Sequence, residues 1–365
     1  MSFVYLWPPM RFAPMKRSLF LLSALSLFGC STELEVNAPY KDITVVYGLL
    51  NQRDTIQYIK INKAFLGEGD AYQYAMIRDS NEYTNEQISH KQIHRLNASG
   101  ARVETFELRD TTVTNRLPGD FYSPEQTVYY FKDGAQPVTG DTFDVFLEQG
   151  SEYELDLVVK GKQISSRTTV VNNFSISSVN SSPTTEVTLF TSNGFQNYLF
   201  KWTSGRYGKR YEASWRFNYS EVDANGDTTE HSITQKFASR VASNSGTPGQ
   251  EFEAQIEGEG FFNTIANQVP VKPNVHRIIR GIDLIVDVAN DEFHTALALN
   301  EPISGIVEER PAYSNVENGL GIFGSRYSKA VIGKQLTTIT MNEMITGSLA
   351  NRNFCYFVGE NLLCD

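Results

Sequence analysis

Cysteine is scarce in this sequence, with three residues among 365. Cys30 stands alone near the N-terminus, whereas Cys355 and Cys364 both lie in the last eleven residues. In an exported protein such a C-terminal pair oxidises and closes a small loop. The alternative is a pair of metal ligands, but no histidine lies near these cysteines in sequence. A disulfide between Cys355 and Cys364 is therefore the favoured prediction.

Basic side chains are in deficit. The chain has 32 Lys and Arg against 42 Asp and Glu, which gives a formal net charge of -10. A surface with this excess of negative charge repels phosphate backbones, so the composition argues against nucleic-acid binding.

The apolar run at the N-terminus is too short for a membrane span. It covers about 11 residues, from Ser18 to Phe28, whereas a spanning helix needs roughly 20. It follows the basic pair Lys16 and Arg17 and ends at Gly29. A charged segment, a short apolar segment and a small residue at the cut predict a secretory signal peptide over residues 1–29, with Met15 as a second candidate start.

The last four residues of this leader region, Leu-Phe-Gly-Cys at 27–30, resemble the box cut by bacterial lipoprotein signal peptidase, although Phe28 replaces the usual small residue. In that processing the cysteine thiol receives a diacylglycerol and becomes the new N-terminus. Several acyl chains hold firmly to a bilayer without any spanning helix. We therefore expect lipidation of Cys30 and a tether to a bacterial envelope membrane; the alternative is an ordinary secreted protein in which Cys30 is incidental.

Residues 30–40 form a short acidic tether that contains Glu33 and Glu35. It resembles the acidic tag that directs Bacteroidetes lipoproteins to the outer face of the outer membrane. Removal of residues 1–29 takes away three basic residues and no acid, so the remaining chain carries a net charge of −13.

The body of the chain is rich in aromatic residues, and Val, Ile and Thr recur in short runs, which favours strands over helices. Paired strand signals separated by turn residues occur at 43–50 with 55–65, at 92–96 with 102–108, and at 153–159 with 163–171, with a short helix near 71–77. This spacing predicts an immunoglobulin-like β-sandwich over residues 41–172.

A second β-rich domain is expected over residues 173–365, ending in the cysteine-containing tail. Its clearest strand is Tyr211–Tyr219, where Ala and aromatic residues alternate with polar ones over nine positions. Residues 198–202 predict a partner strand in a hairpin closed by Ser204–Gly208. One or two short helices are expected, at 260–268 and 341–349, with a further strand at 277–288.

Trp202 and Trp215 lie on the aromatic faces of these two strands. Core packing is the ordinary role of such a stripe. The alternative is a sugar-stacking platform, which makes Trp202 and Trp215 candidate ligand-facing residues.

The segment Gly319–Gly324 spells the dinucleotide pattern G-x-G-x-x-G. That chemistry needs the glycines in a turn between a strand and a helix, whereas this segment follows a loop. We interpret it as a glycine-rich bend feeding an edge strand.

Two further patterns are typical of metal sites but incomplete. Asp223, Asn225 and Asp227 alternate like calcium ligands, yet an EF-hand would need Gly and Glu where this chain has Thr, so a hairpin turn is favoured. His90 and His94 stand four apart, but they lead into a strand, and no third ligand is evident. No metal ligand or cofactor is assigned.

No catalytic residue is assigned either. The sequence contains no G-x-S-x-G elbow, and a bridged or acylated cysteine cannot act as a nucleophile. A glycosidase-like pair of carboxylates stays open, because sequence alone cannot place two carboxylates at catalytic separation.

The lipoprotein box, the hairpin at 153–168 and the segment from Pro311 to Gly324, with Ser314, Asn315 and Val316 before its glycines, together resemble one family. These are Bacteroidetes lipoproteins known only as a domain of unknown function, many of which end in a Ser-Asn-Ile/Val-x-x-Gly-x-Gly-x-Phe-Gly segment. The resemblance would cover nearly all of the mature chain. It implies an outer-membrane lipoprotein, periplasmic or surface-exposed, often found beside TonB-dependent receptors, and it brings no catalytic residues.

Two functions are therefore expected from the sequence. The first is a membrane-anchored, non-enzymatic binding or accessory module that partners a TonB-dependent outer-membrane transporter. The alternative is a surface hydrolase acting on glycans or peptides, which would need converging carboxylates in a pocket.

Overall fold

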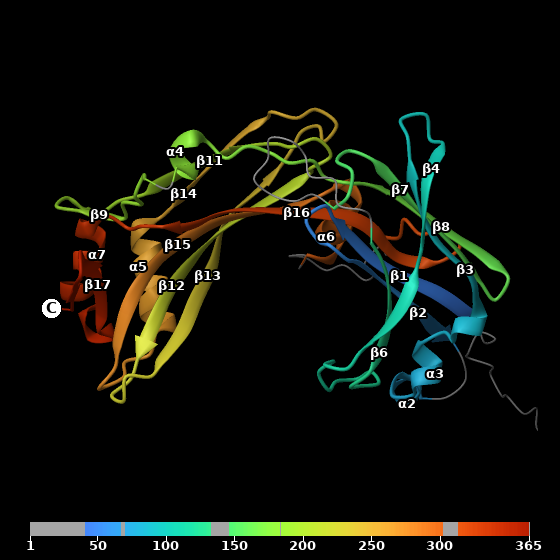
Figure 1. Ribbon diagram of the computed structural model, residues 1–365, viewed down its shortest axis with the longest axis horizontal. Coiled ribbons are helices and arrows are strands. Elements are labelled where there is room, and N and C mark those ends of the chain that lie inside the picture. Colours follow the sequence, from blue (N-terminus) through green and yellow to red (C-terminus); the bar gives the residue numbers. More distant parts are fainter. Residues whose placement is uncertain (1–40, 67–69, 133–145, 183, 302–312, 365) are drawn as a thin grey trace, which may run out of the picture. The chain divides into compact units, whose positions relative to one another are not determined.

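The computed structural model describes residues 41–66, 70–132, 146–182, 184–301 and 313–364. The expected signal peptide over 1–29, the lipidation site Cys30 and the acidic tether 30–40 lie outside these residues. The described chain is mainly β, as predicted (Figure 1). None of its helices combines the length and the apolar character that a bilayer span requires.

The strands before residue 173 are β1 (Lys41–Asn51), β2 (Gln57–Leu66), β3 (Ile88–Leu96), β4 (Arg102–Glu107), β5 (Arg109–Val113), β6 (Gln126–Phe131), β7 (Glu152–Val159) and β8 (Lys162–Thr169). Those after it are β9 (Phe190–Thr191), β10 (Gly194–Phe195), β11 (Tyr198–Thr203), β12 (Arg210–Val222), β13 (Thr228–Val241), β14 (Glu251–Ile256), β15 (His276–Ala289), β16 (Leu320–Lys334), β17 (Phe354–Val358) and β18 (Asn361–Leu363).

The helices are short. They are α2 (Ala71–Ala75), α3 (Arg78–Asn81), α4 (Ser178–Ser181), α5 (Gly258–Gln268), α6 (Asp291–Asn300) and α7 (Thr338–Thr346), with 3₁₀ turns η1 (Asn85–Gln87) and η2 (Ala350–Arg352). The described region after residue 173 thus has four α-helices, more than the one or two expected. Helix α6 was not predicted; the side chain of Asn290 caps its start by accepting a hydrogen bond from Phe293 N.

One long sheet contains strands from both halves of the sequence, in the order β13-β12-β15-β16-β1-β2-β6-β5 (Figure 1). Its central pairing is parallel and joins β1 to β16, with Val45 opposite Leu320 and Asn51 opposite Arg326. A second sheet has the order β4-β3-β7-β8. Because paired residues of β1 and β16 are 275 positions apart in sequence, their pairing is set by tertiary structure and not by local sequence.

Two hydrophobic clusters form the core, and they divide the sequence between Val170 and Val171. The first cluster takes residues from β1, β2 and β6 of the long sheet and from β3, β7 and β8 of the second sheet, so the two sheets enclose it. Val316 and Phe323 are the members that come from the C-terminal half. The domain boundary at residue 172 stays a prediction, as does the immunoglobulin-like type of the first region.

The glycine-rich segment 319–324 begins β16, which is an inner strand between β15 and β1. The prediction of an edge strand is therefore wrong. Gly321 has φ +109, and a Cβ there would collide with the carbonyl of Val46, so the close parallel approach of β16 to β1 requires glycine. Asn315 fixes the entry of this strand by donating to Phe323 O at 2.7 Å and accepting from Phe323 N at 2.9 Å.

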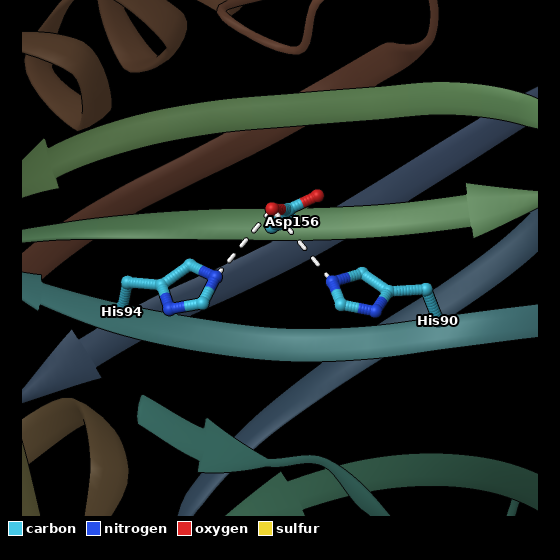
Figure 2. Close-up of side chains that lie close together, drawn as sticks. All are labelled: His90, His94 and Asp156. Atoms are coloured by element: carbon cyan, nitrogen blue, oxygen red, sulfur yellow. Dashed lines mark ion pairs between the residues drawn. The ribbon is translucent and has the colours of Figure 1, made fainter. Parts of the chain in front are cut away.

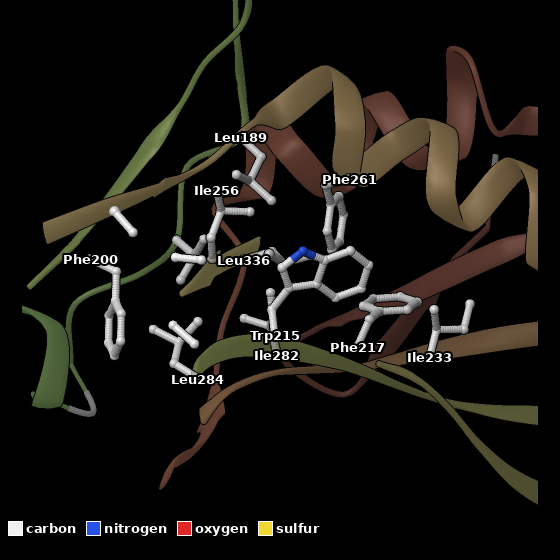
Figure 3. Close-up of a cluster of buried hydrophobic side chains, with 14 of the residues drawn as sticks. Leu189, Phe200, Trp215, Phe217, Ile233, Ile256, Phe261, Ile282, Leu284 and Leu336 are labelled. Atoms are coloured by element: carbon white, nitrogen blue, oxygen red, sulfur yellow. The ribbon is translucent and has the colours of Figure 1, made fainter. Parts of the chain in front are cut away.

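The second cluster is built on the inner face of β12, where Tyr211, Ala213, Trp215, Phe217 and Tyr219 are buried as the period-two pattern predicts. Helix α5 covers this face, with Phe261 against Trp215 at a ring-centroid distance of 4.9 Å (Figure 3). The predicted hairpin between 198–202 and 211–219 is wrong. β11 pairs with β14, and β12 has both edges occupied by β13 and β15, so the turn at 204–208 carries the chain from the β11–β14 sheet into the long sheet.

At the C-terminus the structure joins Cys355 and Cys364 by a disulfide. Cys355 is fully buried on β17, and β17 pairs in parallel with the start of β15. The bridge thus fastens β18 and the end of the chain to the second cluster.

Candidate functional site

Trp202 and Trp215, the candidate ligand-facing aromatics, are both buried, with 2% of each side chain exposed. Their assignment to a sugar-stacking platform is corrected to core packing. The reason is that both rings belong to the second cluster, where Phe252 of β14 packs against Trp202 and Phe261 of α5 packs against Trp215. Stacking on a pyranose ring requires an exposed face.

A cavity of about 410 Å³ does border Trp202 at the edge of β11, where Glu251 and Glu253 of β14 also lie. Both glutamates are exposed, and Glu253 forms an ion pair with Lys201 at 3.2 Å. This arrangement does not bring carboxylates together beside an exposed indole, which is what a glycan hydrolase would need at this place.

The pattern Asp223, Asn225, Asp227 forms the hairpin turn between β12 and β13, as predicted. Asp223 N donates to Asp227 O at 3.0 Å, and Asp223 Oδ1 accepts from the backbone N–H groups of Asn225 and Asp227. The aspartate therefore organises the turn.

His90 and His94 both project from the outer face of β3, the face opposite the first core cluster. Figure 2 shows their imidazoles turned towards Asp156 on the neighbouring strand β7. His90 Nε2 lies 3.7 Å and His94 Nε2 3.4 Å from Asp156 Oδ2. Asp156 is thus the third member of this group, and the sequence did not reveal it. It lies 62 positions beyond His94, and the pairing of β3 with β7 brings it beside the two histidines.

Arginines neutralise the carboxylates around these histidines. Arg102 donates to Glu154 at 2.7 Å and to Asp156 at 2.8 Å, and Arg167 donates to Glu154 at 2.8 Å. Burial alone raises the pKa of each carboxyl, but the hydrogen bonds outweigh it and hold the pKa of both Glu154 and Asp156 below the usual range. Burial, and then repulsion from Arg102, lowers the pKa of His94, which keeps this imidazole neutral near pH 7.

A cavity of about 590 Å³ opens on the outer face of β1 and β2, and its size is that of a small-molecule site. The strands supply its floor, helix α2 and the loop at 116–121 supply its walls, and Figure 1 shows α2 and α3 beside β2 and β6. Its charged side chains are Lys60, Lys63, Arg116 and Asp120, and its main polar and aromatic groups come from Tyr47, Asn62, Tyr72 and Phe121. We call this cavity the β1–β2 pocket.

Period-two alternation in β2 places the pocket's polar residues. Ile59 and Ile61 are buried in the first core cluster, so Lys60 and Asn62 between them point to the opposite face. On β1 the same alternation buries Val46 and directs Tyr47 outward, where its side chain is 52% exposed.

Hydrogen bonds hold the pocket walls against the sheet. Asp70 caps α2 by accepting from Tyr72 N at 2.9 Å, and the buried Asn81 donates to Ala75 O at 2.7 Å and Ile77 O at 2.8 Å, which fixes α2 to α3. Tyr122 N donates to Ala75 O at 2.9 Å and ties the loop to α2.

Helix α3 is in turn fixed to β6. Arg78 bonds Glu82 at 3.0 Å and Thr127 at 3.1 Å, and Glu82 accepts from the backbone N–H of Thr127. The loop, α2 and α3 are thus bonded to one another, and α3 joins them to the long sheet through β6.

The charged residues of the pocket lining are three cations, Lys60, Lys63 and Arg116, and one carboxylate, Asp120, so positive charge is in excess there. Lys60 makes no hydrogen bond or ion pair within the described residues, and the guanidinium of Arg116 contacts only the ring of Phe121 there, at 5.5 Å from the centroid. Burial, and then repulsion from Arg116, lowers the pKa of Lys60, with a smaller opposing effect from Glu82. Lys63 at the pocket rim also has a lowered pKa through burial and lies 5.5 Å over the ring of Tyr83.

An acceptor and several aromatic faces complete the site. Asn62 Oδ1 is buried and has no hydrogen-bond partner in the described chain, so it is available to a donor group of a ligand. Tyr72 is 73% and Phe121 51% exposed, unusually high values for large aromatic side chains. The arrangement can hold a molecule with an apolar body and an anionic group.

Sequence reasoning predicted the helix near 71–77 but did not identify the pocket. The available signal was the polar face formed by Lys60 and Asn62 in the alternation of the strand, together with the aromatic residues around 71–77. That signal becomes informative only when α2 and the loop at 116–121 are known to cover the same face.

Comparison with models of known protein families finds no match to this chain, and comparison with curated protein sequences finds none either.

Proposed function

We propose that the protein is a lipid-anchored envelope lipoprotein of the bacterial outer membrane that acts as a binding or accessory module, and that its β1–β2 pocket binds a small amphipathic anion. The observation that carries the binding function is the pair of partly buried cations, Lys60 and Arg116, which make no ion pair within the described residues and lie among aromatic side chains, with Asp120 the one carboxylate of the lining. A ligand carboxylate or phosphate would supply the missing negative charge.

The anchor is supported by the sequence alone. The Leu-Phe-Gly-Cys box at 27–30 supports lipidation of Cys30, and the resemblance to Bacteroidetes lipoproteins supports an outer-membrane location with a TonB-dependent receptor as partner. In this proposal the region 41–172 is a sandwich of immunoglobulin-like type that carries the pocket.

The chemistry of one converging pair of carboxylates, Glu154 and Asp156, favours binding over hydrolysis, although burial raises the pKa of another carboxyl, that of Glu292. A glycosidase needs one carboxyl group with a raised pKa to act as an acid. Glu154 and Asp156 do converge, but their arginine partners lower both pKa values. A surface hydrolase acting on glycans or peptides is therefore the weaker alternative.

Binding is tested with 2-naphthoate as the probe, because it joins a flat apolar body to one carboxylate. Its neutral counterpart 2-naphthamide has nearly the same shape. We expect isothermal titration to give at least tenfold tighter binding of the carboxylate, and Lys60→Met to remove that preference. Lys201→Met, which removes an exposed cation on β11, is the matched control and should bind as the wild type does. Equal binding of both probes, or equal loss in both variants, would contradict the proposal.

The anchor is tested separately by expressing the full chain with Cys30→Ala in a bacterial host. We expect the wild type in the membrane fraction, with an N-terminal peptide carrying the mass of the lipid, and the variant in the soluble fraction. Thr32→Ala serves as the control and should remain in the membrane fraction. Sedimentation of the Cys30→Ala protein with membranes, unmodified in mass, would refute the anchor.

The partner is tested by co-purification from detergent-solubilised membranes, followed by mass spectrometry. We expect a TonB-dependent receptor to accompany the wild-type protein. Recovery of the protein alone in several detergents would contradict the accessory function without affecting the pocket.

A further inference from the structure

We propose that His90, His94 and Asp156 form a zinc site on the outer face of the second sheet. The site is separate from the β1–β2 pocket, because it uses residues of β3 and β7 and shares no side chain with the pocket lining. Two imidazole nitrogens and one carboxylate oxygen are a common ligand set for Zn²⁺, which then keeps a fourth position for water.

The separations of the ligand atoms fit one ion. In a tetrahedral site with metal–ligand bonds of about 2.0–2.1 Å, neighbouring ligand atoms are about 3.4 Å apart. His94 Nε2 and His90 Nε2 lie 3.4 and 3.7 Å from Asp156 Oδ2, and the three ligand atoms are all within 4.8 Å of one another. The remaining edge joins the two imidazole nitrogens, and we expect it to shorten on zinc binding through rotation of the His90 ring, the more exposed of the two at 35%.

An unsatisfied nitrogen points into this site. His94 is 3% exposed, and its Nε2 has no hydrogen-bond partner among the described residues, although it faces the carboxylate (Figure 2). Its other ring nitrogen, Nδ1, lies 2.9 Å from Thr105 Oγ1. When Nδ1–H donates to that hydroxyl, the Nε2 lone pair is directed at the site, and a cation between Nε2 and the carboxylate gives this nitrogen its missing partner.

The carboxylate of Asp156 is also held in place by a neighbouring side chain. Gln163 Nε2 donates to Asp156 Oδ1, which leaves Oδ2 towards the histidines. Such outer contacts orient a ligating carboxylate and are characteristic of metal sites.

Arg102 is the competitor for this site, because its Nη2 lies 2.8 Å from the same Oδ2. It has a second carboxylate to hold, since its Nε donates to Glu154 at 2.7 Å, and its side chain is 49% exposed. Zinc binding therefore displaces one arginine hydrogen bond while Arg102 stays paired with Glu154. Removal of the guanidinium should strengthen zinc binding, which a merely structural histidine cluster does not predict.

The experiment titrates Zn²⁺ into the purified full chain in detergent and follows binding by calorimetry, with Co²⁺ absorption as an independent readout of tetrahedral coordination. We expect one ion per chain. His90→Ala and Asp156→Asn should each weaken binding at least tenfold, Arg102→Gln should tighten it severalfold, and His276→Gln, a histidine on β15, should leave it unchanged. His90 is half-exposed, so its variant is expected to fold, and circular dichroism checks this.

Absence of zinc binding at one ion per chain would overturn the proposal. So would equal binding by the wild type and both ligand variants, or weaker binding by Arg102→Gln. The naphthoate assay of the β1–β2 pocket is run on the same preparations and is expected to be unchanged in all of them, so failure of the zinc site and failure of the pocket are distinguished.

Discussion

Two faces of the N-terminal region lie on opposite sides of one core, and they differ in whether their charged side chains form ion pairs. On the outer face of β1 and β2, Lys60 and Arg116 have no anionic partner in the described chain. On the outer face of β3 and β7, Glu154 and Asp156 are held by arginines from β4 and β8. The comparison teaches that partnered charges fasten strands together, whereas unpartnered ones beside a cavity remain available to a ligand.

The largest effect on stability is expected in the first core cluster, which lies beneath both faces. Leu155 is fully buried in the first core cluster, on β7 between Glu154 and Asp156. Leu155→Ala should lower the free energy of unfolding by about 3 kcal/mol, since it removes buried methyl groups and leaves a cavity. Urea denaturation measures this, and Val103→Ala, at a position 53% exposed, should change it little. Equal stability of the two variants would show that the sheets do not enclose a common core.

The second effect on stability concerns only the outer face of β3 and β7, where the carboxylates are paired with arginines. Glu154→Gln should lower the free energy of unfolding by about 2 kcal/mol at pH 7, because two charge-assisted contacts are lost while the arginines stay half-solvated. The native pKa of Glu154 is depressed, so its contribution is present above the unfolded pKa of about 4.3 and disappears as pH falls through the native value. The difference between wild type and variant should therefore shrink below about pH 4. A difference independent of pH would contradict the pairing.

The third prediction is the contrasting result on the pocket face. Lys60→Met should change the free energy of unfolding by no more than about 0.5 kcal/mol, because no ionic contact is broken. The same urea assay measures it. A loss as large as that of Glu154→Gln would mean that Lys60 has a structural partner, and the contrast between the two faces would fail.

The smallest effect is a pH dependence of ligand binding. Burial, and then repulsion from Arg116, lowers the pKa of Lys60 below its ordinary 10.5, and the anion binds the protonated amine. The affinity for 2-naphthoate should thus be constant near neutral pH and fall as pH rises through the native pKa of Lys60. Lys60→Arg keeps its charge at every pH tested and should lose this dependence. An unchanged profile in Lys60→Arg would assign the titration to another group.

Local patterns were sufficient for much of the fold. Alternation in β12 predicted its buried aromatic face, the turn around Asp223 was recognised, and helix α5 was placed within two residues. Pairing was the part that local patterns missed. Residues 198–202 were predicted to pair with the strand that follows them, β12. Their actual partner is β14, some fifty residues further along the chain.

The candidate sites show the same division. Sequence spacing brought His90 and His94 to attention but not Asp156, and it placed Trp202 and Trp215 on an aromatic stripe without saying which layer covers it. Lys60 looked like an ordinary outward residue of a strand. Its isolation beside Arg116 depends on a loop more than fifty residues away.

The mainly β character, the faces of individual strands and the C-terminal cysteine pair could all be read from local sequence, because each depends on neighbours within a few residues. Only the tertiary structure decided that β16 lies beside β1, that α2 closes a pocket over Lys60 and that Asp156 faces two histidines. The physical reason is that side-chain alternation is a property of the local backbone, whereas strand partners are chosen by the packing of the whole chain.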